Sequence, residues 1–144
     1  MGRKIVQSVE IDAPPAKVWR HLTDGRLLSS WLMPTEHFEA KVGCSFLFRT
    51  VPVGDVGGWD GIVHCVVREV VDERRLAFSW TSSALGADTV VTITLDGLGG
   101  RTRVTLEHAG WDGLPPEKLW LVDEHDRGWS QLLGPRLKTQ VEEA

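Results

Sequence analysis

Two polar side chains, His108 and Asp126, interrupt otherwise apolar patterns in this sequence. Pairing the segment 101–108 with 88–95 places His108 beside Thr89 at one end of an apolar sheet face. An imidazole there could hold a polar group of a bound molecule, or act as a general base, since its ordinary pKa is about 6.5. The sequence fixes no carboxylate beside His108. We therefore favour two other roles over catalysis: a half-buried histidine that makes its hydrogen bonds within the protein, or a contact to a ligand. No catalytic residue is assigned.

Asp126 falls inside an apolar stripe at helical spacing near the C-terminus. A carboxylate in that position needs a cation, a hydrogen-bond donor or water. Two interpretations stay open. Asp126 is either part of a structural ion pair or a water-filled end of the core, or it is a polar anchor for a ligand between helix and sheet. His125 is expected at the edge of the stripe, on the surface. The stripe consists of Leu119, Val122, Trp129, Leu133 and Leu137.

Other chemistries find no support in the sequence. The motifs GxGxxG, GxxxxGK[ST], HExxH and GxSxG do not occur. Cys44 and Cys65 form no CxxC pair and have no nearby pair of histidines, so we expect neither a metal site nor a cofactor. The glycines at 54, 57 and 58 precede no helix, which argues against a phosphate-binding loop.

Length and charge further limit the classes of protein to which this chain could belong. The chain has 144 residues, 42% of them hydrophobic and 25% charged, which predicts one globular domain over 1–144. The net charge of -4 and the lack of a basic cluster argue against nucleic acid as a partner. No apolar run approaches the roughly 18 residues of a membrane span, and the first residues do not resemble a signal peptide. We therefore expect a cytoplasmic protein.

Periodicity and turn signals predict an α+β fold. We expect a curved antiparallel sheet of about seven strands around a long C-terminal helix, with two short helices after the first strand. Pro135 should produce a kink or change of axis at 131–135. The expected strands are 3–12, 38–42, 44–50, 59–71, 75–80, 88–95 and 101–108; the helices follow Pro14-Pro15, span 26–31, and run from Pro116 toward Val141.

Seven Trp, four Phe and no Tyr point to either a bulky core or a wide apolar cavity. Pairing the last strands should place Trp80 near Thr89, Val91 near Leu106 and Ile93 near Val104, all on the concave face. Trp31 fits a core position and a cavity mouth about equally well. The candidate ligand-binding residues are Trp31, Trp80, Val91, Ile93, Leu106, His108, Val122, Asp126 and Trp129.

Four stretches carry a resemblance to a known family. They are residues 11–19 (IDAPPAKVW), Leu22-Thr-Asp24 with Trp31 downstream, 75–80 (RLAFSW), and Gly128-Trp129 followed by leucines at 132, 133 and 137. In this order they resemble the START-related helix-grip superfamily of birch-pollen-allergen-like proteins. The subfamily they resemble most is named after the activator of the heat-shock protein's ATPase.

The resemblance implies binding of a small apolar molecule in a cavity between the C-terminal helix and the sheet. Because the superfamily includes polyketide cyclases and aromatases, an enzyme of that kind is the alternative. In that alternative His108 or Asp126 would move protons. A chaperone-associated protein-interaction module is a further alternative, and a homodimer is left open.

Overall fold

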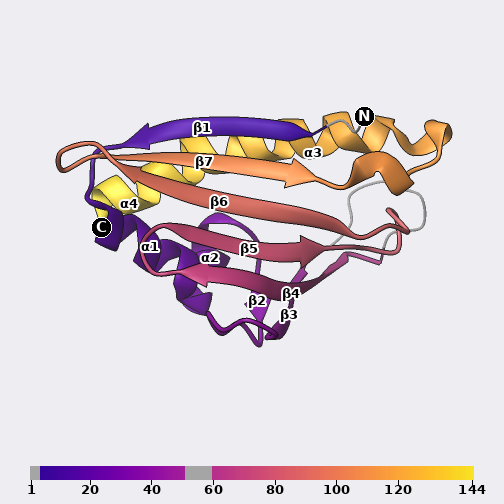
Figure 1. Ribbon diagram of the computed structural model, residues 1–144, viewed down its shortest axis with the longest axis horizontal. Coiled ribbons are helices and arrows are strands. Elements are labelled where there is room, and N and C mark those ends of the chain that lie inside the picture. The colour runs from indigo at the N-terminus through magenta and orange to yellow at the C-terminus, as the bar shows by residue number, and fades with distance from the viewer. Residues whose placement is uncertain (1–3, 51–59) are drawn as a thin grey trace.

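Seven antiparallel strands form one curved sheet in the order β1-β7-β6-β5-β4-β3-β2 (Figure 1). The computed structural model describes residues 4–50 and 60–144. The glycines at 54, 57 and 58 and the first residue of each strand expected at 3–12 and 59–71 lie outside the described residues. The strands are β1 (Ile5–Ile11), β2 (Thr35–Glu36), β3 (Ser45–Arg49), β4 (Ile62–Val71), β5 (Arg75–Trp80), β6 (Thr89–Gly97) and β7 (Thr102–Ala109).

Two short helices follow the first strand, as predicted: α1 (Pro15–Thr23) and α2 (Gly25–Trp31). Pro15 is tolerated in the first turn of α1 because that position needs no helical N–H partner. Asp24 separates the helices and caps α2, since its carboxylate accepts from the backbone N–H groups of Arg26 (2.9 Å) and Leu27 (3.4 Å). This cap fixes where α2 begins, and therefore where Leu32 and Met33 emerge from its end.

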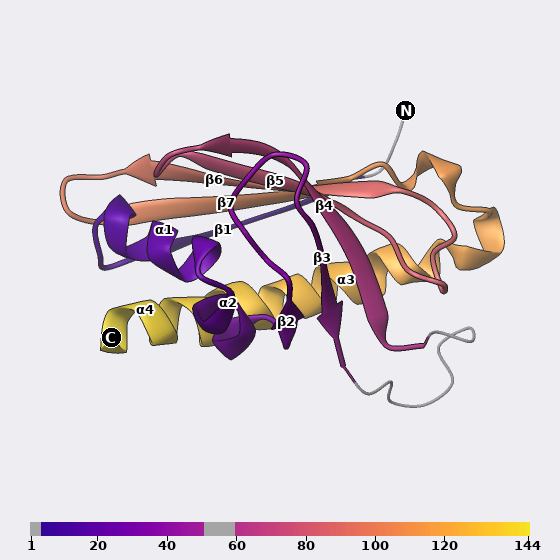
Figure 2. The ribbon, with the colours of Figure 1, turned by 90° about the horizontal axis from the view of Figure 1, so that it is seen from below.

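The C-terminal helical segment lies under the concave face of the sheet (Figure 2). Two 3-10 turns, Trp111–Gly113 and Pro116–Lys118, precede α3 (Trp120–Gln131), a π-helix (Leu132–Lys138) and α4 (Thr139–Glu143). The change expected around Pro135 is a π-helix that contains this proline, and the chain stays helical on both sides. The wider π turn bonds residues five apart, and so accommodates a ring that would crowd the carbonyl four residues back in an α-helix.

Two expectations about the sheet were wrong. Residues 38–42 form no strand, because His37 takes a left-handed backbone (φ 67°) that breaks the extended chain just before them. Val91 lies opposite His108 and Ile93 opposite Leu106, a shift of two residues from the expected pairing. The hairpin is tighter than expected, since Gly97 still pairs with Thr102 before the turn. A two-residue shift leaves every side chain on its predicted face.

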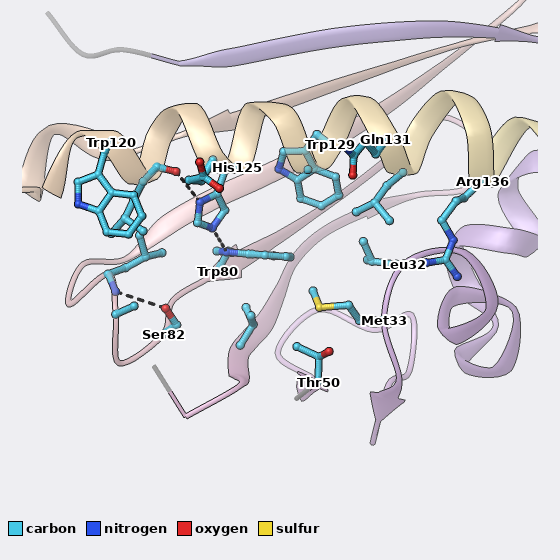
Figure 3. A pocket seen from close by; sticks show the side chains of 17 residues that line it. Leu32, Met33, Thr50, Trp80, Ser82, Trp120, His125, Trp129, Gln131 and Arg136 are labelled. Atoms are coloured by element: carbon cyan, nitrogen blue, oxygen red, sulfur yellow. Dashed lines mark hydrogen bonds between the residues drawn. The ribbon is translucent and has the colours of Figure 1, made fainter. Parts of the chain in front are cut away.

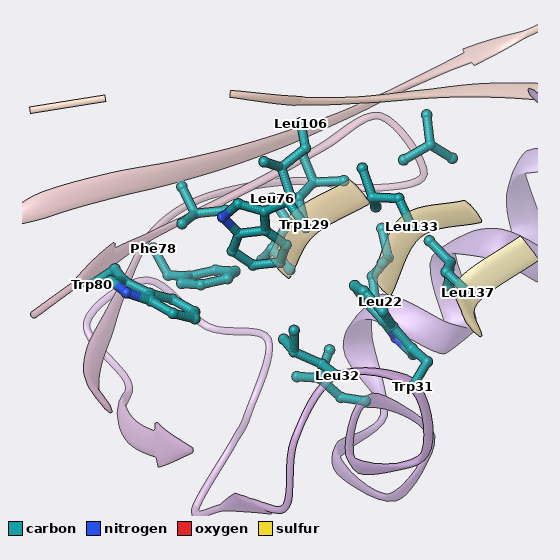
Figure 4. Close-up of a cluster of buried hydrophobic side chains, with 14 of the residues drawn as sticks. Leu22, Trp31, Leu32, Leu76, Phe78, Trp80, Leu106, Trp129, Leu133 and Leu137 are labelled. Atoms are coloured by element: carbon teal, nitrogen blue, oxygen red, sulfur yellow. The ribbon is translucent and has the colours of Figure 1, made fainter. Parts of the chain in front are cut away.

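The concave face and the C-terminal helical segment together form the core (Figure 4). Trp80 lies opposite Thr89 as predicted, and His64 points outward while Cys65 is buried. The order and layering confirm the predicted α+β helix-grip architecture. Among the described helices, none is long and apolar enough to cross a membrane. The buried residues facing each other are Leu76, Phe78, Val91, Ile93, Val104 and Leu106 on the sheet and Val122, Trp129, Leu133, Leu137 and Val141 on the helical segment.

Candidate functional site

A pocket of about 550 Å³ opens between α3, the end of α2 and the ends of the central strands (Figure 3). We call it the α3 pocket. Its walls are mainly apolar, and the tryptophans Trp80, Trp120 and Trp129 contribute the largest side chains. The lining residues are Leu32, Met33, Thr50, Val63, Trp80, Ser82, Ala84, Leu85, Trp120, Leu121, Glu124, His125, Gly128, Trp129, Gln131, Leu132 and Arg136.

Local sequence explains why this space is open. Trp80 is the last residue of β5, and Trp129 lies on the face of α3 that is turned toward the sheet. Between Trp129 and His125 on the helix stands Gly128, where an added Cβ would meet no other atom within 4 Å. Trp120, in the first turn of α3, is 47% exposed at the far end of the pocket. The missing side chain at Gly128 thus leaves room beside two large rings.

One wall of the pocket is backed by a cluster of aromatic and imidazole rings. We call Trp80, His108, Trp111, His125 and Trp129 the Trp/His cluster. The His108 and Trp111 rings are closest, with centroids 4.3 Å apart, and the Trp80 and Trp129 ring centroids are 5.3 Å apart. Such offset and tilted arrangements are favourable between aromatic rings. The cluster therefore joins β5, β7, the first 3-10 turn and α3 into one wall.

His108 is completely buried in this cluster and has hydrogen bonds at both ring nitrogens. The indole Nε1 of Trp129 donates to Nδ1 at 3.0 Å, and Nε2 lies 2.7 Å from the Thr89 hydroxyl. Because an indole N–H can only donate, His108 carries its proton on Nε2 and donates it to Thr89. Thr89 in turn donates to the Trp80 carbonyl oxygen at 2.6 Å. This chain of bonds holds His108 neutral.

His125 is half-buried and faces the pocket from α3. Its Nδ1 lies 2.8 Å from the Leu121 carbonyl oxygen, and its Nε2 accepts the indole N–H of Trp80 at 3.2 Å. A carbonyl only accepts and an indole only donates, so the proton of His125 is on Nδ1. His125 thus fixes the Trp80 ring that forms the pocket floor.

Burial lowers the pKa of both cluster histidines. The pKa of His108 lies well below its ordinary value, mainly because burial penalises the charged ring and secondly because a charge on His125 would repel it. Burial also lowers the pKa of His125, against opposing effects of the Leu121 carbonyl and the Glu124 charge. Both rings are therefore neutral near pH 7.

The structure separates eight of the nine candidate residues, all except Asp126, into three groups. Trp80 and Trp129 line the α3 pocket. His108 lies behind the pocket wall, in contact with both of these tryptophans. The others, Trp31, Val91, Ile93, Leu106 and Val122, are buried core residues outside the pocket lining.

Trp31 in particular occupies a core position rather than a cavity mouth. It is 0% exposed and donates its indole N–H to the His21 carbonyl oxygen at 2.9 Å. Its neighbours Leu32 and Met33 provide the pocket lining instead.

The predicted position of Asp126 was wrong. Asp126 is exposed, accepts a hydrogen bond from Gln7 Nε2 at 2.6 Å, and lies outside the α3 pocket lining. The helical projection failed because it was anchored on Leu119, which precedes α3, and on Leu137, which follows the π turn. Within α3 alone the buried face is centred on His125, about 100° from Asp126.

The sequence prediction included only Trp80 and Trp129 of the lining residues, and missed among others His125, Trp120 and Arg136. His125 was expected at the surface, but a projection restricted to Trp120–Gln131 places it between Leu121 and Trp129. Limiting the helical projection to these residues would therefore have identified His125 from the sequence. For Arg136 no local signal existed, since its place depends on how α2 packs against the π-helix.

Neither cysteine lines the α3 pocket. Cys65 is buried, and burial raises the pKa of its thiol. Cys44 is half-buried, and the two thiols are unbonded to each other. Within residues 4–50 and 60–144, no group of three His, Cys, Asp or Glu side chains is placed to hold a metal ion.

The sequence carries the signature of a known family. Residues 12–142 match the sequence profile described as Activator of Hsp90 ATPase homolog 1-like protein. The chain belongs to this family. The family match confirms the resemblance inferred from the four stretches. A search among curated proteins gives no match.

Solved structures share the same fold over nearly the whole chain. Protein MLL2253 from Mesorhizobium loti is 26% identical with a TM-score of 0.82, covering 99% of this chain and 98% of its own. DynU16, a protein in the dynemicin biosynthetic locus, is 27% identical with a TM-score of 0.75, covering 96% of this chain and 47% of its own. The Aha1 dimer from Colwellia psychrerythraea is 17% identical (TM-score 0.71, 97% and 96% covered) and supports the fold alone.

Proposed function

We propose that this protein binds a small, mainly apolar organic molecule in the α3 pocket. The observation that carries the proposal is the pocket itself, which holds about 550 Å³ between three tryptophans. Small-molecule sites commonly have volumes of about 300–1,000 Å³, apolar walls and a few polar groups. The polar lining groups here are few: Thr50, Ser82, Glu124, His125, Gln131 and Arg136.

The hydrogen bonds within the cluster favour binding over catalysis. Both nitrogens of His108 and both of His125 already have partners in the protein. A general base would need a free nitrogen within reach of the substrate. Asp126, the other group considered for proton transfer, is exposed outside the pocket. Neither His108 nor Asp126, the two groups considered for proton transfer, is therefore available to a molecule in the pocket, which disfavours the cyclase-like alternative.

The surface gives little support to a protein-interaction module. Among the described residues, the exposed large hydrophobic side chains are spread over separate segments, including Val6 on β1, Val42 before β3 and Leu98 in the last hairpin turn. An interaction surface would gather them into one patch. Trp120 is exposed as well, but it belongs to the rim of the α3 pocket.

A fluorescence titration with the neutral apolar probe N-phenyl-1-naphthylamine tests the proposal. Its emission should rise saturably with one site in the wild-type protein. Gly128→Phe places a ring inside the pocket without a clash at Cβ and should weaken binding at least about tenfold. Ser130→Phe adds the same ring on the opposite, exposed face of α3 and serves as the matched control.

Two results would contradict the proposal. One is the absence of saturable probe binding to the folded wild-type protein. The other is equal affinity of wild type and Gly128→Phe, which would place the probe elsewhere. Circular dichroism of each variant shows that a lost signal does not come from unfolding.

A further inference from the structure

We infer that the ligand of the α3 pocket is an organic acid, with its carboxylate at Arg136 and its apolar body against Trp129 and Trp80. This inference rests on the proposed function and adds the chemical class of the ligand. It starts from the charges around the rim of the pocket, which differ between its two ends.

Arg136 is the cation of the pocket. It comes from the π-helix and reaches toward α2 (Figure 3). There its Nη2 donates to the Ser30 carbonyl oxygen at 2.9 Å. Among the lining residues that the structure describes, no other Arg or Lys occurs. The guanidinium is thus held at a fixed place by one hydrogen bond, beside Leu32 and Met33.

Arg136 also lacks a counter-ion among the residues that the structure describes. Within residues 4–50 and 60–144, no carboxylate lies within ion-pair distance of it. By contrast, Arg49, Arg75, Arg103 and Arg127 each contact a glutamate. A guanidinium has five N–H donors, and the bond to Ser30 uses one of them. The others can bind a carboxylate through two parallel hydrogen bonds.

The opposite end of the pocket presents a carboxylate, and no cation among the described lining residues. Glu124 lines that end, near Trp120, and forms an ion pair with Arg127 at 2.7 Å. It precedes Arg136 by twelve residues, or roughly 18 Å of helix. His125 between them is neutral and adds no attraction for an anion. An acid in the pocket is therefore favoured in one orientation, with its carboxylate away from Glu124.

The apolar lining between these ends fits the rest of such a molecule. Trp129 and Leu132 lie on the helix side between His125 and Arg136, and Trp80 faces them from β5. Gln131 lines the pocket within about a turn of Arg136 and offers an amide as a second polar contact. The ligand class is therefore a carboxylic acid with a flat or branched apolar body.

A matched pair of probes tests this inference: 1-naphthylacetic acid and 1-naphthylacetamide, titrated calorimetrically. We expect the wild-type protein to bind the acid about tenfold more tightly than the amide at low salt. Arg136→Gln should remove the preference, because it lowers the affinity for the acid much more than the affinity for the amide. Arg103→Gln, which removes an exposed arginine from the outer sheet face, is the control and should keep the preference. Added salt should reduce the preference.

The outcomes separate the two proposals. If acid and amide bind equally to the wild-type protein, or if Arg136→Gln keeps the preference, the carboxylate assignment is overturned and the apolar pocket stands. If neither probe binds, both proposals fail.

Discussion

Acid should destabilise this protein between about pH 6.5 and 5.5, because two histidines are neutral in the folded state. His108 and His125 have lowered pKa values when folded, whereas an unfolded histidine titrates near 6.5. Below pH 6.5 the unfolded chain therefore binds more protons than the folded one, and the free energy of unfolding falls with pH. The stabilisation is fully present above the unfolded pKa and is lost as the pH falls toward the folded pKa.

The size of the effect follows from proton linkage. Each histidine that is protonated only when unfolded costs about 1.4 kcal/mol per pH unit. Two such residues give a slope of up to about 2.7 kcal/mol per pH unit below 6.5. Protonating His108 in place would also set its new N–H against the Trp129 indole N–H. Domain stabilities are about 5–15 kcal/mol, so the loss is readily measured.

Urea unfolding followed by tryptophan fluorescence, repeated from pH 7.5 to 5.5, measures this slope. His125→Gln keeps an acceptor for the Trp80 indole and removes one titrating group, so its slope should be about half that of the wild type. The glutamates with lowered pKa values, Glu36 and Glu142, are hydrogen-bonded by Arg49 and Lys138 and lose their contribution only below about pH 4.5. An unfolding free energy that is the same at pH 7.5 and 5.5 would refute the buried, neutral histidines.

Other predictions follow from burial and helix geometry. Asp126→Asn should leave probe affinity unchanged and shift the unfolding free energy by less than about 0.5 kcal/mol, since Asp126 is exposed. A large loss of probe affinity would instead show that Asp126 contributes to binding. Iodoacetamide should modify Cys44 well before Cys65 in the native protein, as mass spectrometry of peptides can show; equal rates would contradict the burial of Cys65. In hydrogen exchange, amides after Pro135 should exchange faster than those of Leu121–Trp129, because the π-helix is the less stable segment; equal protection would argue for one rigid helix.

Much of the fold could be predicted because strand patterns and short turns are local signals. The strand Arg75–Trp80 has its predicted bounds, and Trp80 lies opposite Thr89 as expected. The last hairpin was misaligned by two residues, since Asp96 and Gly97 look like turn residues but still pair with Arg103 and Thr102. The positive backbone angles that make the turn occur at Gly99 and Gly100. Sequence alone does not tell which glycine in such a run takes that conformation.

The candidate site was predictable only in part. His108 was correctly placed on the concave face beside Thr89, because alternation along a strand determines the face. The sequence prediction placed Asp126 on the buried face and His125 at the surface, which is the reverse of what the structure shows. The error came from treating the last thirty residues as one α-helix. A 3-10 turn before α3 and the π-helix after it each change the rotation per residue. Arg136 reaches the pocket through tertiary packing on α2, which no periodicity encodes.

Indole resonances offer the most direct test of ligand binding in the α3 pocket. In a ¹H–¹⁵N correlation spectrum each tryptophan gives one indole N–H peak, so N-phenyl-1-naphthylamine can be located by the peaks that it moves. The pocket predicts saturable shifts for Trp80, Trp120 and Trp129, which line it, and an unchanged peak for Trp19 on α1. Shifts confined to Trp19, or no shift at saturating probe, would contradict a binding site between α3 and the sheet.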